Sequence, residues 1–148
     1  MIETYRLDEK TLPALPGPHD CVIKSITIDE SFIVFRFENN IVSHDSISNF
    51  RPESDCLIIR YHLCDPCFFT YYQIKHTTVI GKRFGKHGYY EVENEFLLRP
   101  SKFDLEFLYQ NISYNSIIIK LWRRGGIIID ASVDYIEYEW INKAKMDD

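Results

Sequence analysis

The sequence predicts a mostly β protein made of antiparallel sheet, arranged as a sandwich or an open barrel with at most one or two short helices. The composition indicates this, because the chain has 20 Ile, 10 Phe and 10 Tyr but only 3 Ala. Branched and aromatic side chains pack well on a pleated sheet, whereas helices favour alanine. Several short segments also alternate apolar and polar residues, as half-buried strands do. The length predicts one domain, residues 1–148.

The N-terminal part predicts an irregular lead-in followed by a hairpin. Residues 1–18 form the lead-in, because three prolines and a glycine fall within residues 13–18. Residues 20–28 and 32–38 each alternate, and a short turn separates them, so that they predict two paired strands. The inward residues of the second strand are Ile33, Phe35 and Phe37.

The middle of the chain predicts a loop and then further strands. Residues 39–55 are polar and indicate a loop, with a short edge strand at 41–42. Residues 57–63 and 68–77 are rich in Ile, Tyr and Phe, and each predicts a strand. Residues 78–84 either pair with the second of these strands or extend it.

The C-terminal third predicts one ambiguous segment and four strands. Residues 89–98 fit either a strand or a short helix. The strands expected after it are 103–107, 116–122, 126–131 and 133–140. The second and third of these form a hairpin around a Gly-Gly turn. Residues 142–148 are a polar tail that we expect to fray.

Charge and hydropathy exclude several classes of protein. The formal net charge is −5, which does not favour nucleic-acid binding through a broad basic face. The apolar runs are too short for a membrane-spanning helix, and residues 1–10 lack the apolar core of a signal peptide. We therefore expect a cytoplasmic protein without a membrane partner.

The cysteines suggest a metal site that we do not expect to form. Cys64 and Cys67 have the spacing of a zinc knuckle, and His62 could supply a third ligand. A structural zinc site needs four ligands, and Cys21 and Cys56 stand alone in the sequence. The prediction is that the protein has no bound zinc and no cofactor, with the cysteines packed as small apolar residues.

A basic and aromatic segment offers one possible binding surface. Residues 66–90 contain no Asp or Glu, and seven aromatic residues are interspersed with the basic ones. The basic side chains that could contact nucleic acid are Lys75, Lys82, Arg83 and Lys86. Phosphate attraction and base stacking would suit a single strand of nucleic acid. The pattern equally fits aromatic residues in a core with lysines in solvent, which we favour.

An acidic cluster near the C-terminus offers a second possible binding surface. Four carboxylates fall within ten residues that contain no basic residue: Asp130, Asp134, Glu137 and Glu139. Together with Tyr135 or Tyr138, they suit recognition of a basic protein surface, in which charge steers the encounter and an aromatic ring anchors it. A solvated strand face has the same pattern. Asp134 and Glu137 have opposite parity, so one of them should face the core.

Both ends of the chain resemble one family. Residues 19–28, His-Asp-Cys-Val-Ile-Lys-Ser-Ile-Thr-Ile, with the alternating residues 33–37, resemble the opening of small β-rich bacterial immunity proteins from polymorphic-toxin systems. Those proteins end with a Phe-x-Leu-x-Phe strand, an apolar hairpin strand and a closing strand, similar to residues 103–107, 127–131 and 133–140 here. The resemblance implies a non-enzymatic protein that binds and blocks one toxin, often a nuclease.

The sequence therefore predicts a protein-binding module, specifically an immunity protein that occludes a basic toxin domain through the acidic cluster. His19 and Asp20 are expected to be structural, with Asp20 capping a turn before the first hairpin. Two alternatives belong to other classes. One is a nucleic-acid-binding β domain that uses residues 68–90, and the other is a β-barrel that holds a small ligand, suggested by the aromatic content.

Overall fold

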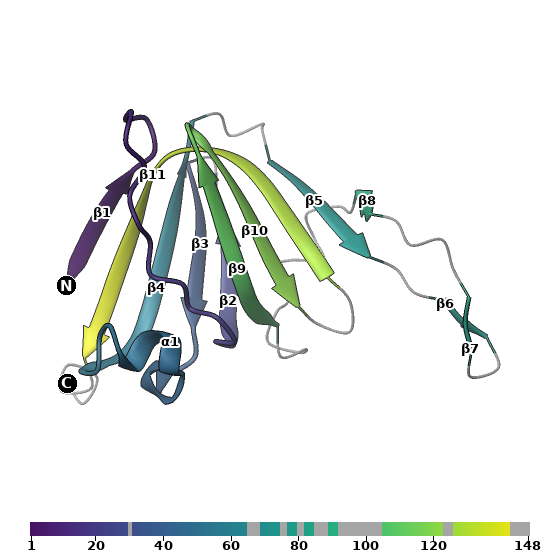
Figure 1. Ribbon diagram of the computed structural model, residues 1–148, viewed down its shortest axis with the longest axis horizontal. Helices are drawn as coiled ribbons and strands as arrows, with labels where there is room; N and C mark the ends of the chain where they lie inside the picture. The colour runs from purple at the N-terminus through teal and green to yellow at the C-terminus, as the bar shows by residue number, and fades with distance from the viewer. Residues whose placement is uncertain are drawn as a thin grey trace.

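The protein folds as a curled antiparallel sheet, which confirms the predicted fold class (Figure 1). The computed structural model describes residues 1–29, 31–64, 69–74, 77–79, 82–84, 89–91, 105–122 and 126–142. The described strands are β1 Ile2–Arg6, β2 Ile23–Ile28, β3 Phe32–Phe37, β4 Ser54–Leu63, β5 Phe69–Ile74, β6 Thr77–Val79, β7 Lys82–Phe84, β8 Tyr89–Glu91, β9 Glu106–Ser113, β10 Ser116–Trp122 and β11 Gly126–Asn142. The described helices are short: a 3-10 helix, Ile41–Ser43, and α1, Asp45–Ser48.

Strand β11 connects the two halves of the sheet. Residues 126–132 pair with β10 and β5, whereas Val133 and residues 135–142 pair with β4, and residues 135–139 also pair with β1. A bulge between Val133 and Tyr135 separates the two halves of the strand, and it bends the strand so that β11 arches over the sheet (Figure 1). The two strands predicted in this region are therefore one.

The curl brings the first and last strands of the sheet together. The strand order is β2-β3-β4-β11-β10-β9. Main-chain hydrogen bonds join its ends, from Asp20 N to Phe107 O (2.8 Å), from Phe107 N to Cys21 O (3.0 Å) and from Ile23 N to Leu105 O (2.8 Å). This seam stops at Phe107. Beyond it, from Leu108 to Ser113, no described strand pairs with that edge of β9.

The hydrophobic core fills the inside of the curl. Phe35, Phe37 and Phe107 are fully buried, and Phe107 meets the other two rings edge-to-face at centroid distances of 6.2 and 5.8 Å. Tyr61 and Trp140 are also buried there. These side chains occupy the interior, so the described residues do not support the alternative of a β-barrel that holds a small ligand inside the sheet.

A Pro-rich strap, residues 12–19, links β1 to β2 across the face of the sheet (Figure 1). Buried side chains hold it in place. The Tyr138 hydroxyl donates to the main-chain oxygen of Pro16 at 2.8 Å, and the amide Nε2 of Gln110 donates to the Tyr138 hydroxyl. Tyr61 in turn donates to Oε1 of Gln110 at 2.8 Å. The network connects the strap to three strands.

Three local predictions are wrong. Residues 1–18 are not wholly irregular, because β1 forms and pairs with β11. Residues 41–42 belong to the 3-10 helix and not to an edge strand. Residues 78–84 neither extend β5 nor pair with it, because β6 and β7 pair with each other. For β1 and for β6 and β7, the pairing partner, which local pattern does not reveal, decided the structure.

Two other predictions are tested only in part. Within residues 89–98, the structure describes β8, a strand, and the remaining residues lie outside the described part. The predicted tail, residues 142–148, overlaps β11 by one residue, because Asn142 is the last residue of that strand. Residues 143–148 lie outside the described part of the chain. Within the described residues, no helix has the length and apolar character needed to cross a membrane.

Candidate protein-binding surface

The bulge in β11 places most of the predicted acidic residues on the outer face of the sheet. Residues 127, 129, 131 and 133 face the core in the first half of the strand, whereas residues 136, 138 and 140 do so in the second. Asp134 and Glu137 therefore both lie outside, despite their opposite parity. The prediction that one of them faces the core is wrong, because a bulge adds one residue to the alternation.

Strand β4 supplies side-chain partners to this acidic cluster. Asp134 Oδ1 lies 2.5 Å from Nδ1 of His62, and Glu139 accepts a hydrogen bond from Arg60 at 2.6 Å. Both partners come from β4, which runs beside the second half of β11. Arg60 is also opposite Glu137 in the strand register. No basic residue falls within the cluster in the sequence, but in the structure Arg60 and His62 of β4 lie beside it. The second half of β11 therefore does not form a purely acidic patch.

The two tyrosines predicted to contact a partner have different environments. Tyr135 is partly exposed, and its ring stacks on His62 with centroids 4.4 Å apart and an interplanar angle of 15°. Tyr138 is fully buried, and burial raises the pKa of its hydroxyl well above the ordinary value. Tyr138 is therefore corrected from a candidate contact to a core residue.

Asp130 alone among the predicted residues lies in the first half of β11, and it is exposed. It borders a surface that the sequence analysis did not identify, which we call the Trp122 face. This surface is the outer side of β9, β10 and the first half of β11. Its members are Glu106, Tyr109, Ile118, Lys120, Trp122 and Asp130.

The Trp122 face exposes three large apolar side chains on one side of the sheet. The exposed fractions are 45% for Trp122, 42% for Tyr109 and 41% for Ile118. The strand register places Lys120 opposite Tyr109, and its Nζ lies 5.6 Å from the centre of that ring. Side chains opposite each other on one face of a sheet are in contact range. Along β10, Lys120 lies between Ile118 and Trp122, and Tyr109 is diagonal to both, so the three exposed apolar groups share one face around Lys120.

The charges of the Trp122 face are mainly acidic. Glu106 is opposite Trp122 in the register, and Asp130 is opposite Ile118. Among the described side chains, neither carboxylate has a basic group within ion-pair distance, in contrast to Asp134 and Glu139. Among the described residues of this surface, the basic one is Lys120, whose Nζ lies over the Tyr109 ring. The surface therefore combines aromatic groups with carboxylates available to a partner.

A signal for the Trp122 face is present in residues 116–122. Ile117, Ile119 and Leu121 alternate into the core, so Ile118 and Trp122 must occupy the other face of the strand. A strand that is apolar on both faces is either buried on both or has an exposed apolar side. Which of these two applies depends on the position of β10 in the sheet, which the sequence does not reveal.

The basic residues of the nucleic-acid alternative are not brought together by the described structure. Lys82 and Arg83 belong to β7, of which the structure describes the backbone. Lys75 and Lys86 are outside the described residues. The structure therefore does not test the alternative nucleic-acid interface over residues 68–90.

The cysteines behave differently from one another. Cys64 is exposed, and Cys67 lies outside the described residues. Cys21 and Cys56 are buried, and burial raises the pKa of the Cys21 thiol to about 12, so that its metal-binding thiolate form is disfavoured. No group of three or more metal-ligating side chains occurs among the described residues.

His19 and Asp20 lie at the turn before β2. Asp20 has a φ of 62°, a left-handed conformation that aspartate tolerates in turns, and its carboxylate lies 2.8 Å from His19. Its main-chain N–H closes the seam to β9.

Comparison of the chain with protein-family models, with curated proteins and with solved structures finds no match.

Proposed function

We propose that the protein is a non-enzymatic protein-binding module, and specifically an immunity protein that binds and occludes a cognate bacterial toxin. The Trp122 face is the observation that supports this proposal most directly. Binding hot spots are enriched in tryptophan, tyrosine and arginine, which bury large areas when a partner excludes water around them. The face offers two such rings on one side of the sheet.

The charge of the Trp122 face favours a basic partner. Glu106 and Asp130 lie beside the apolar groups, so a lysine or arginine of the partner can reach a carboxylate while its surroundings pack on Trp122. Complementary charge of this kind accelerates the encounter of two proteins, and it selects against acidic partners. A toxin that acts on nucleic acid carries the basic surface that such a face would recognise.

The paired histidine on the outer face fits a structural role better than catalysis. His62 bonds to Asp134, stacks on Tyr135 and meets Phe32 edge-to-face at 5.0 Å. These contacts tie β3, β4 and β11 together. We therefore assign the protein a function in stoichiometric binding and not in turnover.

The experiment co-expresses the protein with neighbouring genes and then applies affinity capture and a growth-rescue assay. We expect a basic protein to be captured and its toxicity to be suppressed. Trp122→Ala should weaken binding by about tenfold or more. Tyr114→Ala is the matched control, because Tyr114 is also exposed and aromatic but lies in the β9–β10 turn. Capture of single-stranded nucleic acid with no protein partner would contradict the proposal.

A further inference from the structure

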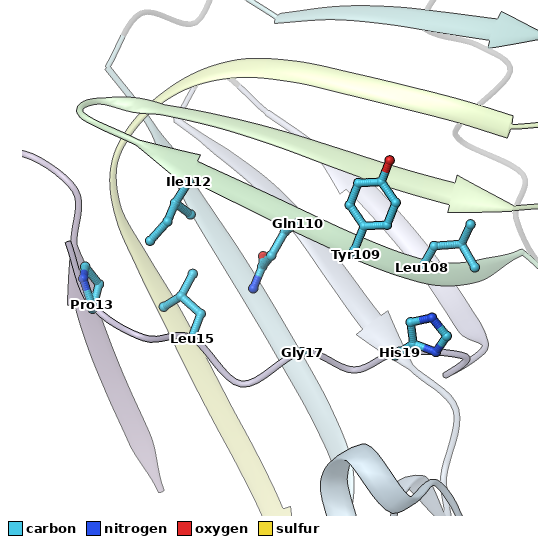
Figure 2. Close-up of a pocket in the computed structure, with 8 residues that line it drawn as sticks. All are labelled: Pro13, Leu15, Gly17, His19, Leu108, Tyr109, Gln110 and Ile112. Atoms are coloured by element: carbon cyan, nitrogen blue, oxygen red, sulfur yellow. The ribbon is translucent and has the colours of Figure 1, made fainter.

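The space between the strap and the free edge of β9 forms a slot of about 290 Å³ (Figure 2). One wall is β9, from Leu108 to Ile112, and the other is the strap. The strap residues that line the slot are Pro13, Leu15, Gly17 and His19. Figure 2 shows Leu15 and Ile112 directed into the space, while Tyr109 points away from the strap.

The β9 wall presents main-chain hydrogen-bonding groups to the slot. Ser113 and Ser116 flank a two-residue turn and form a hydrogen-bonded pair, so in an antiparallel ladder Asn111 and Tyr109 also bond to β10. The main-chain N–H and C=O of Gln110 and Ile112 then point the other way, toward the strap. In the described part of the chain, the strap makes no main-chain hydrogen bond to either residue.

The strap cannot pair with this edge as a strand, for two reasons. Its prolines, at positions 13, 16 and 18, lack the N–H that a ladder needs. It is also held at a distance, because the Gln110 side chain and the Tyr138 hydroxyl bridge β9 to Pro16. This bridge consists of a side chain and a hydroxyl, whereas strands paired about 4.8 Å apart are joined directly by main-chain bonds. It forms the floor of a slot whose open side faces solvent.

We infer that this slot receives an extended polypeptide segment, which adds to β9 as a further strand. Gln110 and Ile112 lie two residues apart, about 7 Å, which is the repeat with which an extended chain offers its own N–H and C=O groups. Main-chain bonds would supply affinity, and pockets for alternate side chains would supply selectivity. Because Pro13, Leu15, Leu108 and Ile112 line the slot, the alternate side chains directed into it should be apolar.

The slot is continuous with the Trp122 face, since Tyr109 belongs to that face and also borders the slot. A protein bound over the Trp122 face would therefore have its chain beside the β9 edge. The inference nevertheless stands on the slot itself and does not require the partner proposed above to be a toxin.

The test uses the full chain as bait for a phage-displayed library of random octapeptides. We expect the selected peptides to lack proline at their centre and to carry apolar residues at alternate positions. On binding, the amide hydrogens of Gln110 and Ile112 should exchange with solvent at least about tenfold more slowly, as for newly bonded strand amides. Those of Tyr109 and Asn111, already bonded to β10, should not change.

A blocking variant makes the test specific to the slot. Gly17 lines the slot and a Cβ added there meets no atom within 4 Å, so Gly17→Phe adds bulk at the slot without a backbone clash and should weaken peptide binding by about tenfold or more. Thr27→Phe, on the exposed outer face of β2, is the matched control and should leave binding unchanged. The exchange pattern of the unmodified chain tests the inference even if Gly17→Phe misfolds.

Three results would overturn the inference. One is the selection of no peptide, or of peptides that bind Gly17→Phe as well as the unmodified chain. Another is loss of peptide binding in Trp122→Ala without protection of the Gln110 and Ile112 amides, which places the peptide on the Trp122 face and leaves the proposed function intact. The last is a dimer of the free protein that Gly17→Phe dissociates, because the occupant would then be a second copy of the chain.

Discussion

At the scale of single residues, Gln110 is the polar group on which the interior depends most. Its amide is shared between two buried hydroxyls, those of Tyr61 and Tyr138, and Tyr138 also bonds to Pro16. Buried polar groups are tolerated only when they are hydrogen-bonded, and losing one partner costs the desolvation of the other. One side chain therefore connects the strap, β4, β9 and β11.

Replacing this side chain should destabilise the fold. We expect Gln110→Leu to lower the free energy of unfolding by about 1–3 kcal/mol, because the Tyr61 hydroxyl loses its described acceptor while buried. Asn111→Leu, at an exposed position on the same strand, serves as control and should change stability by less than about 0.5 kcal/mol. Urea unfolding measures both. Equal stability of the two variants would show that the network contributes nothing.

The same tyrosines predict how stability depends on pH. Burial raises the pKa of Tyr61 and of Tyr138 above the ordinary value of 10.0, because the ionised phenol is disfavoured inside the sheet. The unfolded chain ionises these groups near pH 10, whereas the folded chain does not. Their contribution is thus complete below pH 10 and is lost as the pH rises above it. Burial also raises the pKa of the Cys21 and Cys56 thiols, which adds a loss of stability from about pH 9. The difference in urea midpoint between the unmodified chain and a Tyr61→Phe variant isolates the tyrosine part, and it should change only above about pH 10.

At the scale of secondary structure, β11 accounts for both the correct and the incorrect predictions. The alternation in residues 126–131 and 133–140 predicted strands in the right places, because each half has one buried face. The bulge between Val133 and Tyr135 was not predictable, since it depends on pairing with β4. For the same reason the partners of Asp134 and Glu139, which are His62 and Arg60 of β4, could not be found near them in the sequence.

The bulge makes a prediction that differs from strict alternation. We expect Asp134→Lys and Glu137→Lys each to change the free energy of unfolding by no more than about 1 kcal/mol, because both positions are on the outer face and partly exposed. Ile136→Lys, between them, places a charge in the core and should prevent folding. Thermal unfolding followed by circular dichroism compares the three. If either outer variant failed to fold, the register described for β11 would be wrong.

At the scale of the whole molecule, the fold is a layer of sheet curled around one core, with its function assigned to the outside. The sequence predicted the fold class and the two hairpins, because these depend on composition and on local alternation. It did not predict that β1 pairs with β11, that the strap crosses the sheet, or that the Trp122 face is exposed. Each of these depends on contacts between residues far apart in the chain, such as the bond from Met1 to Trp140.

The relocation of the binding surface also predicts how charge controls association. Asp130→Lys should slow association with a basic partner and reduce its dependence on salt, because Asp130 is exposed on the Trp122 face. Glu137→Lys makes the same change of charge on the other half of β11 and should affect the rate much less. Stopped-flow mixing at several salt concentrations measures both rates. A larger change of association rate in Glu137→Lys than in Asp130→Lys would indicate that the partner contacts the acidic cluster instead.

The most direct test of the account is the affinity of the captured partner for Trp122→Ala and Tyr114→Ala, measured by titration calorimetry beside the unmodified protein. The proposal predicts one bound partner per chain, a loss of about tenfold or more in affinity for Trp122→Ala and no change for Tyr114→Ala. Unchanged affinity in Trp122→Ala, with the variant folded as the unmodified protein is, would contradict the claim that this face binds the partner.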